Sequence, residues 1–412
     1  MIDAGMTAGS GRTRFPPPAR RSWGRLLDYV RIDVPQTLLR MLPFPCRTGL
    51  VKIGNPGRDA PVLLTCNFHL TRERVRRALA GMDAYLLVAN SRGVNVWCAA
   101  TGGLFTNHDV ISVLKTSGID RLVDHRRLIL PQLAATGIEG RVVHEKTGWR
   151  TLWGPVDARD LPAFLNRGCE KTEAMGTVEF PLQQRLEMAA AWAFPISLVT
   201  LLVWPFWARG VLPLMALVWC LSLLIFLSFP LYRDRLDGKR KQVGFIFFDF
   251  GERGVPVVLW LLFMATLTVL AALGGAFSWG MVARWGLSAF VILLILGLDL
   301  TGSTPMFKSG LHEDRLLKIE LDTDLCKGAG FCEKVCPTNV FEVDTDLRMA
   351  SLPRAGQCVQ CGACIVQCPF DALYLRSPED EIVTPETIRR FKLNLLGHRK
   401  IAGPTAVTQA KR

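Results

Sequence analysis

A run of four cysteines near the C-terminus has the spacing of an iron–sulfur ligand set. Cys358, Cys361, Cys364 and Cys368 follow one another as C-x2-C-x2-C-x3-C, and Pro369 comes next. In bacterial ferredoxins the first three cysteines of such a run hold one cluster, and the fourth holds the other cluster. A zinc ribbon lacks the third and fourth cysteines at this spacing. The run therefore predicts a bacterial-ferredoxin-type domain.

An earlier half-motif in the same region is incomplete. Cys326, Cys332 and Cys336 precede Pro337, but Ala329 stands where the second cysteine is expected. The cross-ligation rule predicts one complete [4Fe–4S] site, made of Cys336, Cys358, Cys361 and Cys364. The other site has only Cys326, Cys332 and Cys368. Three thiolates can hold a [3Fe–4S] cluster, or a labile [4Fe–4S] cluster whose fourth iron has an outside ligand; loss of this cluster is the remaining alternative.

Cys98 is a candidate metal ligand in a different part of the chain. Residues 95–100 read Asn-Val-Trp-Cys-Ala-Ala and are followed by Thr101, Gly102 and Gly103. A cysteine beside a tryptophan is most often a packing residue. In a short helix, however, Asn95, Cys98, Ala99 and Gly102 would share one face by their i, i+3 and i+4 spacing. That face would present one soft ligand among small residues, so a flat macrocycle could approach it.

The residues around Cys98 alternate between strands and helices. Apolar runs predict strands at 61–68, 85–89, 128–131, 141–143 and 151–153. Capping residues and glycines predict helices over 71–79, 107–116 and 157–165, with Asn107 and Asp157 as caps. This alternation predicts an α/β domain over residues 46–180 with a mostly parallel sheet. Residues 1–45 are expected to form a basic, partly disordered arm with an amphipathic stretch.

Four long apolar runs lie between residues 186 and 302. They cover about 188–207, 211–230, 254–277 and 286–302. About 20 apolar residues are needed to cross the hydrocarbon of a bilayer, so the runs predict a four-helix transmembrane domain, although the last is short. Buried helices of a soluble core are the alternative, but four such runs in succession would leave too little polar surface. The apolar segment 243–250 is too short to cross and is expected at the interface.

The net charge of +13 is concentrated beside these apolar runs. Basic residues crowd into the first 25 residues and the loop 233–253, whereas the two other turns carry only Arg209 and Arg284. The positive-inside rule then predicts a multi-pass protein of the inner (cytoplasmic) membrane, with both soluble domains in the cytoplasm. Membrane lipid is an expected partner. Nucleic acid is not, because no zinc finger, helix-turn-helix or RNP-like motif is visible.

The N-terminal sequence indicates whether the cysteines are expected to form disulfides or to stay reduced. The first 21 residues have no apolar h-region of a signal peptide. Secreted disulfides are therefore not expected, and the cluster spacing favours thiolate ligands on the reducing side of the membrane.

Several segments resemble the family of the mercury-methylating corrinoid protein HgcA. They are residues 49–55, 61–68, 93–100, 125–132, 153–155 and 160–164, and the segment around Cys98 is similar to the family's cap helix. The apolar runs have the family's layout. The α+β dicluster domain expected over 316–376, before a tail at 377–412, resembles the family's ferredoxin partner HgcB. The chain is therefore similar to a fusion of the two over about residues 46–376.

The resemblance implies a corrinoid of the cobalamin type at the sheet edge, with the Cys98 thiolate as an axial cobalt ligand. It implies corrinoid-dependent methyl transfer to Hg(II), giving methylmercury. A methyl donor protein or methyl-tetrahydrofolate would supply the methyl group. An upstream electron donor would reduce the iron–sulfur domain, which reduces the cobalt. The other expected cofactor contacts are Asn95, Val96, Trp97, Ala99, Ala100, Gly102, Thr65, Pro131 and Gln132.

The chain departs from the family pattern in three places. Thr101 and Gly102 stand where the family has Gly-Lys, Ala329 interrupts a cluster motif, and residues 374–412 lack the cysteine pair that ends the family's ferredoxin. These departures weigh against mercury as the acceptor more than they weigh against corrinoid chemistry. One alternative is methyl transfer to another soft acceptor, such as a metalloid or a thiol. The other is a membrane-bound electron-transfer protein that binds no corrinoid, but the retained segment 95–100 argues against it.

Overall fold

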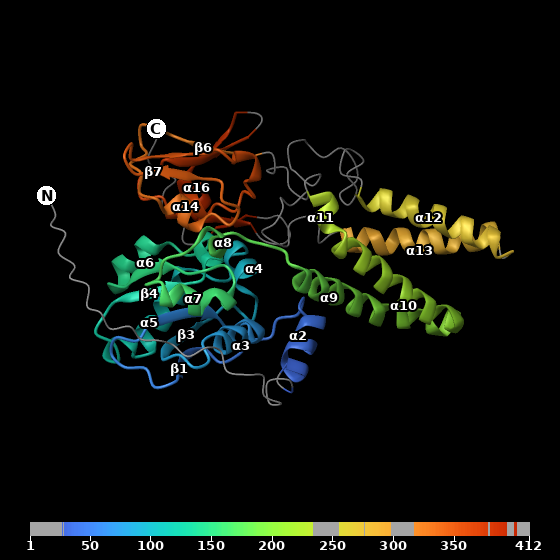
Figure 1. Ribbon diagram of the computed structural model, residues 1–412, viewed down its shortest axis with the longest axis horizontal. Helices are drawn as coiled ribbons and strands as arrows, with labels where there is room; N and C mark the ends of the chain where they lie inside the picture. Colours follow the sequence, from blue (N-terminus) through green and yellow to red (C-terminus); the bar gives the residue numbers. More distant parts are fainter. Residues whose placement is uncertain are drawn as a thin grey trace.

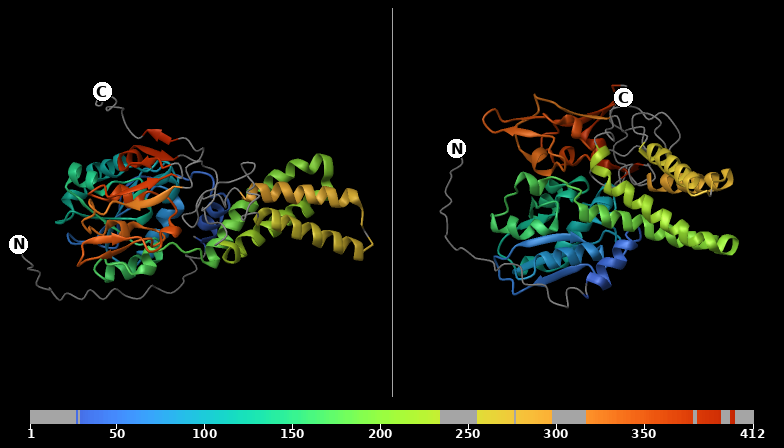
Figure 2. Two further views of the ribbon diagram at one scale, coloured as in Figure 1. Left: turned by 90° about the horizontal axis from the view of Figure 1, so that it is seen from above. Right: turned by 45° about the vertical axis from the view of Figure 1, so that its right-hand side comes forward.

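The structure is a computed structural model that describes residues 27, 29–233, 255–275, 277–297, 317–377, 380–393 and 399–401. An α/β domain, a group of long apolar helices and a cysteine-rich C-terminal domain occupy distinct parts of the structure (Figure 1). The further views show the α/β domain and the C-terminal domain side by side at the same end of the helices (Figure 2). The two soluble parts therefore lie on one side of the helical part.

One five-stranded sheet forms the centre of the α/β domain, with the order β1-β3-β2-β4-β5. Its strands are β1 (Gly49–Ile53), β2 (Val62–Cys66), β3 (Ala84–Ala89), β4 (Arg127–Leu130) and β5 (Arg150–Trp153). The pairings of β2 with β3, β2 with β4 and β4 with β5 are parallel, whereas β1 runs antiparallel to β3. Every residue of β2 and β3 is buried, as expected for central strands covered on both faces. The prediction of a mostly parallel sheet is confirmed, and the edge strand β1 makes the sheet mixed.

The predicted helices of this domain are present with small shifts. They are α3 (His69–Ala78), α5 (Asn107–Thr116) and α7 (Leu161–Asn166), which follows the 3-10 turn η4 (Ala158–Asp160). The cap of α5 is Thr106 rather than Asn107, because Thr106 and Asp109 form a capping box. Asp157 caps η4 through a 2.9 Å bond from the N–H of Arg159.

One predicted strand is wrong. Residues 141–143 lie inside the helix α6 (Gly140–Thr147). The β-branched pair of valines favoured a strand, but only Val143 of the two is fully buried, as on one face of a helix. Gly148 ends the helix in the left-handed conformation, with φ +75°, which glycine adopts without steric cost.

Three stretches among the described residues are long and apolar enough to cross a membrane: Leu182–Leu227, Pro256–Leu273 and Trp279–Gly297. The first consists of α9 (Leu182–Thr200), η5 (Leu201–Val203) and α10 (Trp204–Leu227), and it is interrupted by the non-helical Trp207 (φ −153°, ψ 65°). The chain folds back on itself there. Arg185 donates to the carbonyl of Leu227 over 2.9 Å, and Ser222 donates to the carbonyl of Ala189 over 2.9 Å.

The remaining apolar helices are α12 (Val255–Leu273) and α13 (Trp279–Gly297), which pack against each other. The structure corrects the place of Arg284, which lies inside α13 and not in the turn before it, because α13 starts at 279 rather than 286. Its guanidinium lies 5.1 Å from the ring centroid of Trp207, a cation–π contact that suits an arginine in an apolar helix. Most of the predicted basic loop, including 243–250, and residues 298–302 lie outside the described residues.

The C-terminal domain has a three-stranded antiparallel sheet of β6 (Lys318–Leu321), β9 (Leu373–Arg376) and β10 (Ile382–Val383). Two short helices, α14 (Phe331–Val335) and α15 (Ala363–Gln367), pack against each other, and each follows a left-handed glycine, Gly330 or Gly362. The hairpin of β7 (Glu342–Asp344) and β8 (Met349–Ser351) lies between them in the chain.

Elements beyond the predicted boundary at residue 376 pack against this domain. Strand β10 pairs with β9, and α16 (Pro385–Arg390) packs against α15. Arg389 of α16 donates to the carbonyl of Cys368 over 3.1 Å. Part of the predicted tail therefore belongs to the folded domain, and its last described strands are β11 (Phe391–Leu393) and β12 (Arg399–Ile401).

Candidate functional site

The helix that carries Cys98 lies at the carboxyl end of the parallel strands. It is α4 (Val96–Thr101), which follows β3 after a loop of six residues. Open α/β sheets bind cofactors at this edge. The side chain of Asn95 caps α4 and accepts a 3.0 Å hydrogen bond from the N–H of Cys98. The carbonyl of Cys98 accepts a 3.0 Å bond from the N–H of Gly102, so both backbone groups of the cysteine are held.

A buried asparagine that the sequence analysis did not single out fixes the loop before α4. Asn67, at the end of β2, accepts hydrogen bonds from the N–H and hydroxyl of Ser91 over 2.8 and 2.9 Å. It also accepts one from the N–H of Gly93 over 3.0 Å. The hydroxyl oxygen of Ser91 also lies 2.7 Å from the carbonyl oxygen of Val94, so its single hydrogen lies between two acceptors. The only available signal was an amide residue directly after a buried strand.

The open face of α4 differs in part from the predicted one. Val96, Ala99 and Ala100 are buried in the hydrophobic core, so Ala99 does not lie beside Cys98 on an open face. Trp97, Cys98 and Thr101 are partly exposed. The hydroxyl of Thr101 donates back to the carbonyl of Trp97 over 2.8 Å. The face around the cysteine therefore consists of Asn95, Cys98, Thr101 and Gly102.

The other predicted cofactor contacts are distributed along the same edge. Thr65 is buried near the end of β2, and Pro131 precedes the 3-10 helix η3 (Gln132–Thr136) after β4. Gln132 is engaged elsewhere, because its amide donates to the carbonyls of Gly176 and Cys336 over 2.6 and 3.2 Å. Its side-chain oxygen accepts a hydrogen bond from Lys171. In the structure Gln132 bridges the two soluble domains, and its contact with a corrinoid stays a prediction.

A corrinoid suits the residues at this edge. Cys98 offers a partly exposed sulfur on a backbone that hydrogen bonds already fix. Gly102 has no side chain to obstruct an approach, and the hydroxyl of Thr101 is already bonded. The indole Nε1 of Trp153, at the end of β5, is buried and has no acceptor among the described residues. This edge of the sheet therefore offers the Cys98 sulfur as a metal ligand and the buried indole N–H of Trp153 as a hydrogen-bond donor.

Four cysteines of the C-terminal domain surround one small cavity. Its lining includes Cys336, Cys358, Cys361 and Cys364, together with apolar side chains such as Ile319 and Phe341. The N–H of Val340 donates to the sulfur of Cys336 over 3.3 Å, and the N–H of Gln360 donates to that of Cys358 over 3.4 Å. Such N–H···S bonds stabilise thiolate ligands and tune the potential of a bound cluster.

The other three cysteines line a second cavity, with Cys326, Cys332 and Cys368 around the loop Gly328–Gly330. Ala329 lies in this lining and offers no ligand atom there. The structure thus brings the seven cysteines together in the two groups that the cross-ligation rule predicts.

Burial makes these thiols unfavourable as free thiolates. It raises the pKa of Cys332 to about 12 and also raises the pKa values of Cys361 and Cys364, with neighbouring cysteines adding to the effect. A bound cation would reverse this cost by supplying positive charge. Among the described residues no three His, Cys, Asp or Glu side chains converge on a single metal ion. Cysteines spread around a cavity suit a multi-iron cluster better than one zinc ion.

The cysteine-bearing helix α15 is bonded to the α/β domain through one glutamine. Gln367, next to Cys368, donates to the carbonyls of Ala135 and Ile138 over 2.8 and 2.6 Å. Its side-chain oxygen accepts a 3.2 Å bond from the N–H of Gly140. The carbonyls of Ala135 and Ile138 lie in or just after η3, which packs against both α15 and α4.

The contact between η3 and α4 depends on a glycine. A Cβ atom added to Gly137, directly after η3, would lie 2.9 Å from the Cα of Ala100 and 2.8 Å from its carbonyl oxygen. Any side chain here would push η3 away from the helix of Cys98. The two backbones therefore touch directly.

The amino group of Lys171 lies at the interface between the soluble domains, and its pKa is lowered there. Its amino group donates to the carbonyl of Lys334 over 2.6 Å and to Gln132. Desolvation by burial, and secondarily the charge of Lys334, lowers the pKa of Lys171 to about 7. The ammonium form is therefore disfavoured in this interface relative to water.

Two regions of the chain match known protein families. Residues 40–165 match the family of the CO dehydrogenase/acetyl-CoA synthase delta subunit. Residues 318–369 match the 4Fe-4S dicluster domain family. Cys98 lies in the first region and all seven grouped cysteines lie in the second, so the predicted dicluster-type domain is confirmed at the level of family.

Curated relatives each match 30% of this chain. The gamma subunit of the acetyl-CoA decarbonylase/synthase complex from Archaeoglobus fulgidus is 36% identical over 127 residues, which are 30% of this chain and 27% of that subunit. The gamma subunit from Methanopyrus kandleri is 38% identical over 127 residues, with the same shares. Gamma subunit 2 from Methanosarcina mazei is 36% identical over 129 residues, again 30% and 27%. The chain thus spans only 27% of the length of these relatives.

Proposed function

We propose that this chain is a membrane-bound corrinoid methyl-transfer protein whose C-terminal domain delivers electrons to the corrinoid. The observation that carries the proposal is the unbroken contact from the helix of Cys98, through η3, to the cysteine-bearing helix α15. The match of residues 40–165 to the CO dehydrogenase/acetyl-CoA synthase delta subunit family supports it, as do the similarity of 127 residues to a decarbonylase/synthase gamma subunit and the dicluster match.

The α/β domain would hold the cofactor through Cys98. When bound, the corrinoid would supply a cobalt ion that takes up a methyl group and passes it, with its bonding electron pair, to a soft acceptor. Cys98 would ligate that ion, while Asn95 and Gly102 hold the backbone of the cysteine at a fixed position. Asn67 would keep the loop before the helix from shifting. Because hydrogen bonds fix the backbone on both sides of the cysteine, we expect the ligand sulfur to need little reorganisation on binding.

The C-terminal domain would hold two clusters. The group of Cys336, Cys358, Cys361 and Cys364 is assigned a [4Fe–4S] cluster, and the three-cysteine group a [3Fe–4S] or labile [4Fe–4S] cluster. Helix α15 carries Cys364 of the first group and is followed by Cys368 of the second. Gln367 lies between these cysteines in sequence and is bonded to η3, so either cluster has a short bonded path towards α4.

The apolar helices would place this machinery at a membrane. The reversal at Trp207, shown by the bonds from Arg185 and Ser222, supports two antiparallel hairpins and four crossings. Both soluble domains lie at one end of the helices (Figure 2). With the basic loop at 233–253, the positive-inside rule assigns that end to the cytoplasmic face of the inner membrane.

The acceptor we propose is Hg(II), a soft electrophile, with methylmercury as product. The alternative is a metalloid or thiol acceptor, which as a nucleophile would take the methyl group without its bonding electron pair. The test uses the full-length protein in lipid nanodiscs, loaded anaerobically with methylcobalamin and given Hg(II), arsenite or a small thiol in turn. Methylmercury from wild type, and none from Cys98→Ala, would support the proposal. Methylation of arsenite or thiol instead would favour the second acceptor class. Failure of the wild type to retain any corrinoid would leave only the electron-transfer function and contradict the proposal.

A further inference from the structure

The segment before β1 has its polar side turned inward and its apolar side turned outward. It consists of Leu27, the π-helical turn η1 (Tyr29–Asp33), the short helix α2 (Val34–Leu38) and the residues up to 42. Asp33 and Thr37 are buried, with Asp33 only 3% exposed. Leu27, Val30, Val34, Met41 and Leu42 are exposed, with Val30 55% exposed. A segment facing water would show the opposite pattern.

Exposed apolar residues run through the whole segment. Val30 and Val34 are four residues apart across η1 and the start of α2, Leu27 precedes them, and Met41 and Leu42 follow α2. The buried Asp33 and Thr37 are four residues apart on the other side. The outward side is therefore a continuous apolar stripe rather than a set of isolated leucines and valines.

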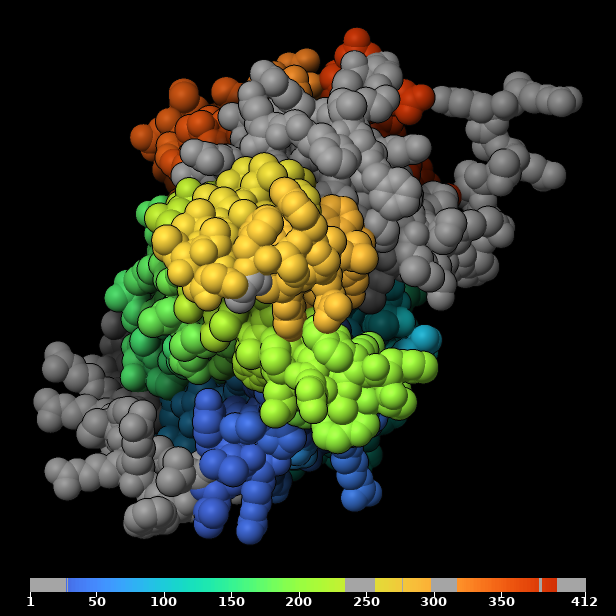
Figure 3. Space-filling model, turned by 90° about the vertical axis from the view of Figure 1, so that its right-hand side faces the viewer, coloured from blue at the N-terminus to red at the C-terminus, as the bar shows by residue number. Residues whose placement is uncertain are grey.

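This stripe is continuous with the apolar helices. Helix α2 packs against α9, whose early residues Leu182 and Leu186 are also exposed. Seen from the helical end of the molecule, the blue N-terminal segment lies beside the green helices, and both are visible on the side turned to the viewer (Figure 3). The two apolar surfaces thus meet at the junction between the soluble and helical parts.

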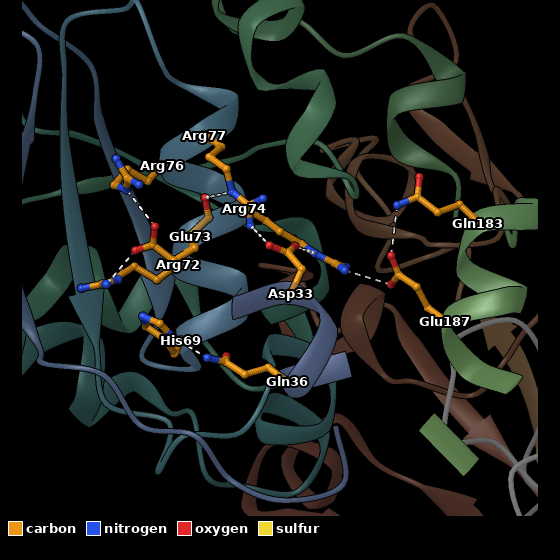
Figure 4. Close-up of polar contacts among 10 residues, drawn as sticks. All are labelled: Asp33, Gln36, His69, Arg72, Glu73, Arg74, Arg76, Arg77, Gln183 and Glu187. Carbon is orange, nitrogen blue, oxygen red and sulfur yellow. Dashed lines mark hydrogen bonds and ion pairs between the residues drawn. The ribbon is translucent and has the colours of Figure 1, made fainter. Parts of the chain in front are cut away.

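Ion pairs hold the segment at this junction (Figure 4). Arg77 of α3 pairs with Asp33 over 2.6 Å. Arg74 lies between Asp33, at 3.7 Å, and Glu187 of α9, at 2.9 Å. The carboxylates of Asp33 and Glu187 are nearly buried, so these pairs are less screened than surface pairs. The segment, α3 and α9 are therefore joined through one arginine.

Two exposed basic residues accompany the stripe. Arg31 lies within the segment, next to Val30, and Arg47 lies five residues after its end. Arginines beside an apolar surface suit the boundary between acyl chains and anionic headgroups.

We propose that Leu27 and residues 29–42 lie in the plane of the membrane interface, with their apolar stripe among lipid chains and with Arg31 and Arg47 at the headgroups. The occupant of the stripe is the bilayer itself, because the stripe continues the surface of α9. Together with α9, the segment attaches the α/β domain at two points, and Arg74 connects the two attachments. The domain is then held at one orientation to the membrane rather than swinging on α9.

An environment-sensitive fluorescent amino acid tests this directly. It is placed at Val30 or Val34 of the full-length protein in nanodiscs, and Leu347, an equally apolar residue that is 70% exposed on the β7–β8 turn, is the matched control position. We expect blue-shifted emission at Val30 and Val34. Lipids brominated near the headgroup should quench it at least twofold, and lipids brominated near the chain end should quench it less. The probe at Leu347 should show neither effect.

Two outcomes would overturn the proposal. Water-like, unquenched emission at Val30 and Val34 would show that the stripe faces solvent. Blue-shifted emission without quenching by brominated lipid would show that protein, such as a second copy of the chain, covers the stripe. An unchanged absorption spectrum of the iron–sulfur domain in each labelled protein shows that the label has not disturbed the fold.

Discussion

The N–H of Cys98 donates a 3.0 Å hydrogen bond to Oδ1 of Asn95, and this bond caps the helix that carries the cysteine. Loss of such a cap costs about 1 kcal/mol of helix stability. In a helix of six residues that loss is a large share of the local stability. The position of the cysteine sulfur thus depends on a neighbour that does not have to touch the cofactor.

Asn95→Ala should therefore weaken retention of cobalamin by about fivefold, the equivalent of about 1 kcal/mol. Asn95→Asp keeps an acceptor and should stay within about twofold of wild type. Equilibrium titration of the full-length protein with cobalamin measures both. If the alanine and aspartate variants bind equally well, the cap has no part in holding Cys98.

Gln367→Leu should slow reduction of the bound corrinoid at least tenfold. The substitution removes the bonds to Ala135 and Ile138 and leaves their buried carbonyls without this donor, so α15 and η3 should separate. Anaerobic stopped-flow absorption, started with a reductant that first reduces the clusters, gives the rate. Gln357→Leu, an exposed glutamine of the same domain, is the control. An unchanged rate in Gln367→Leu, with intact clusters, would exclude η3 as the path.

Ala329→Cys should convert the three-cysteine group into a complete set, because residue 329 lies in the lining of that cavity. EPR of the anaerobically purified wild type should show an oxidised S = 1/2 signal of a three-iron cluster, and the substitution should remove it. Two ordinary [4Fe–4S] signals in the reduced wild type, unchanged by Ala329→Cys, would show that residue 329 does not stand at a ligand position.

The proposed membrane topology predicts on which side of the membrane each turn lies. Reporters inserted at Arg209 and at Gly275 should be periplasmic, and a reporter after residue 412 should be cytoplasmic, because the basic loop at 233–253 marks the inner face. Alkaline phosphatase and fluorescent-protein fusions distinguish the two sides. A periplasmic C-terminal reporter would put the clusters on the wrong side for their proposed electron source.

The spacing of the cysteines was sufficient to predict how they group, because cluster geometry constrains local loops that each contain several ligands. The α/β domain was predictable for the same reason, since strand and helix signals are local. The prediction of a strand at residues 141–143 was wrong because the β-branched propensity of two valines is a weak signal. Burial on one side only and the helix-ending glycine Gly148 outweigh it. The reversal at Trp207 and the start of α13 were missed in detail because hydropathy marks apolar runs, not their ends.

The contacts between the domains could not be predicted from the sequence. Gln132 and Cys336 are 204 positions apart, and Gln367 and Ala135 are 232 apart, so no local pattern connects them. Asn67 was missed for the same reason, because its partners lie on a later loop. The open face of α4 was partly wrong because helical spacing alone does not say which side the core covers; Ala99 lies towards the core, and Thr101 takes its place.

Ligation of cobalt by Cys98 is the central claim, and X-ray absorption at the cobalt edge tests it most directly. The full-length protein, reconstituted anaerobically with cobalamin, is compared with Cys98→Ala and with Cys46→Ala, a half-buried cysteine of the same domain. A sulfur scatterer should be present in wild type and in Cys46→Ala and absent in Cys98→Ala. Wild-type protein that binds cobalamin without a sulfur neighbour, or that shares its spectrum with Cys98→Ala, would contradict the account.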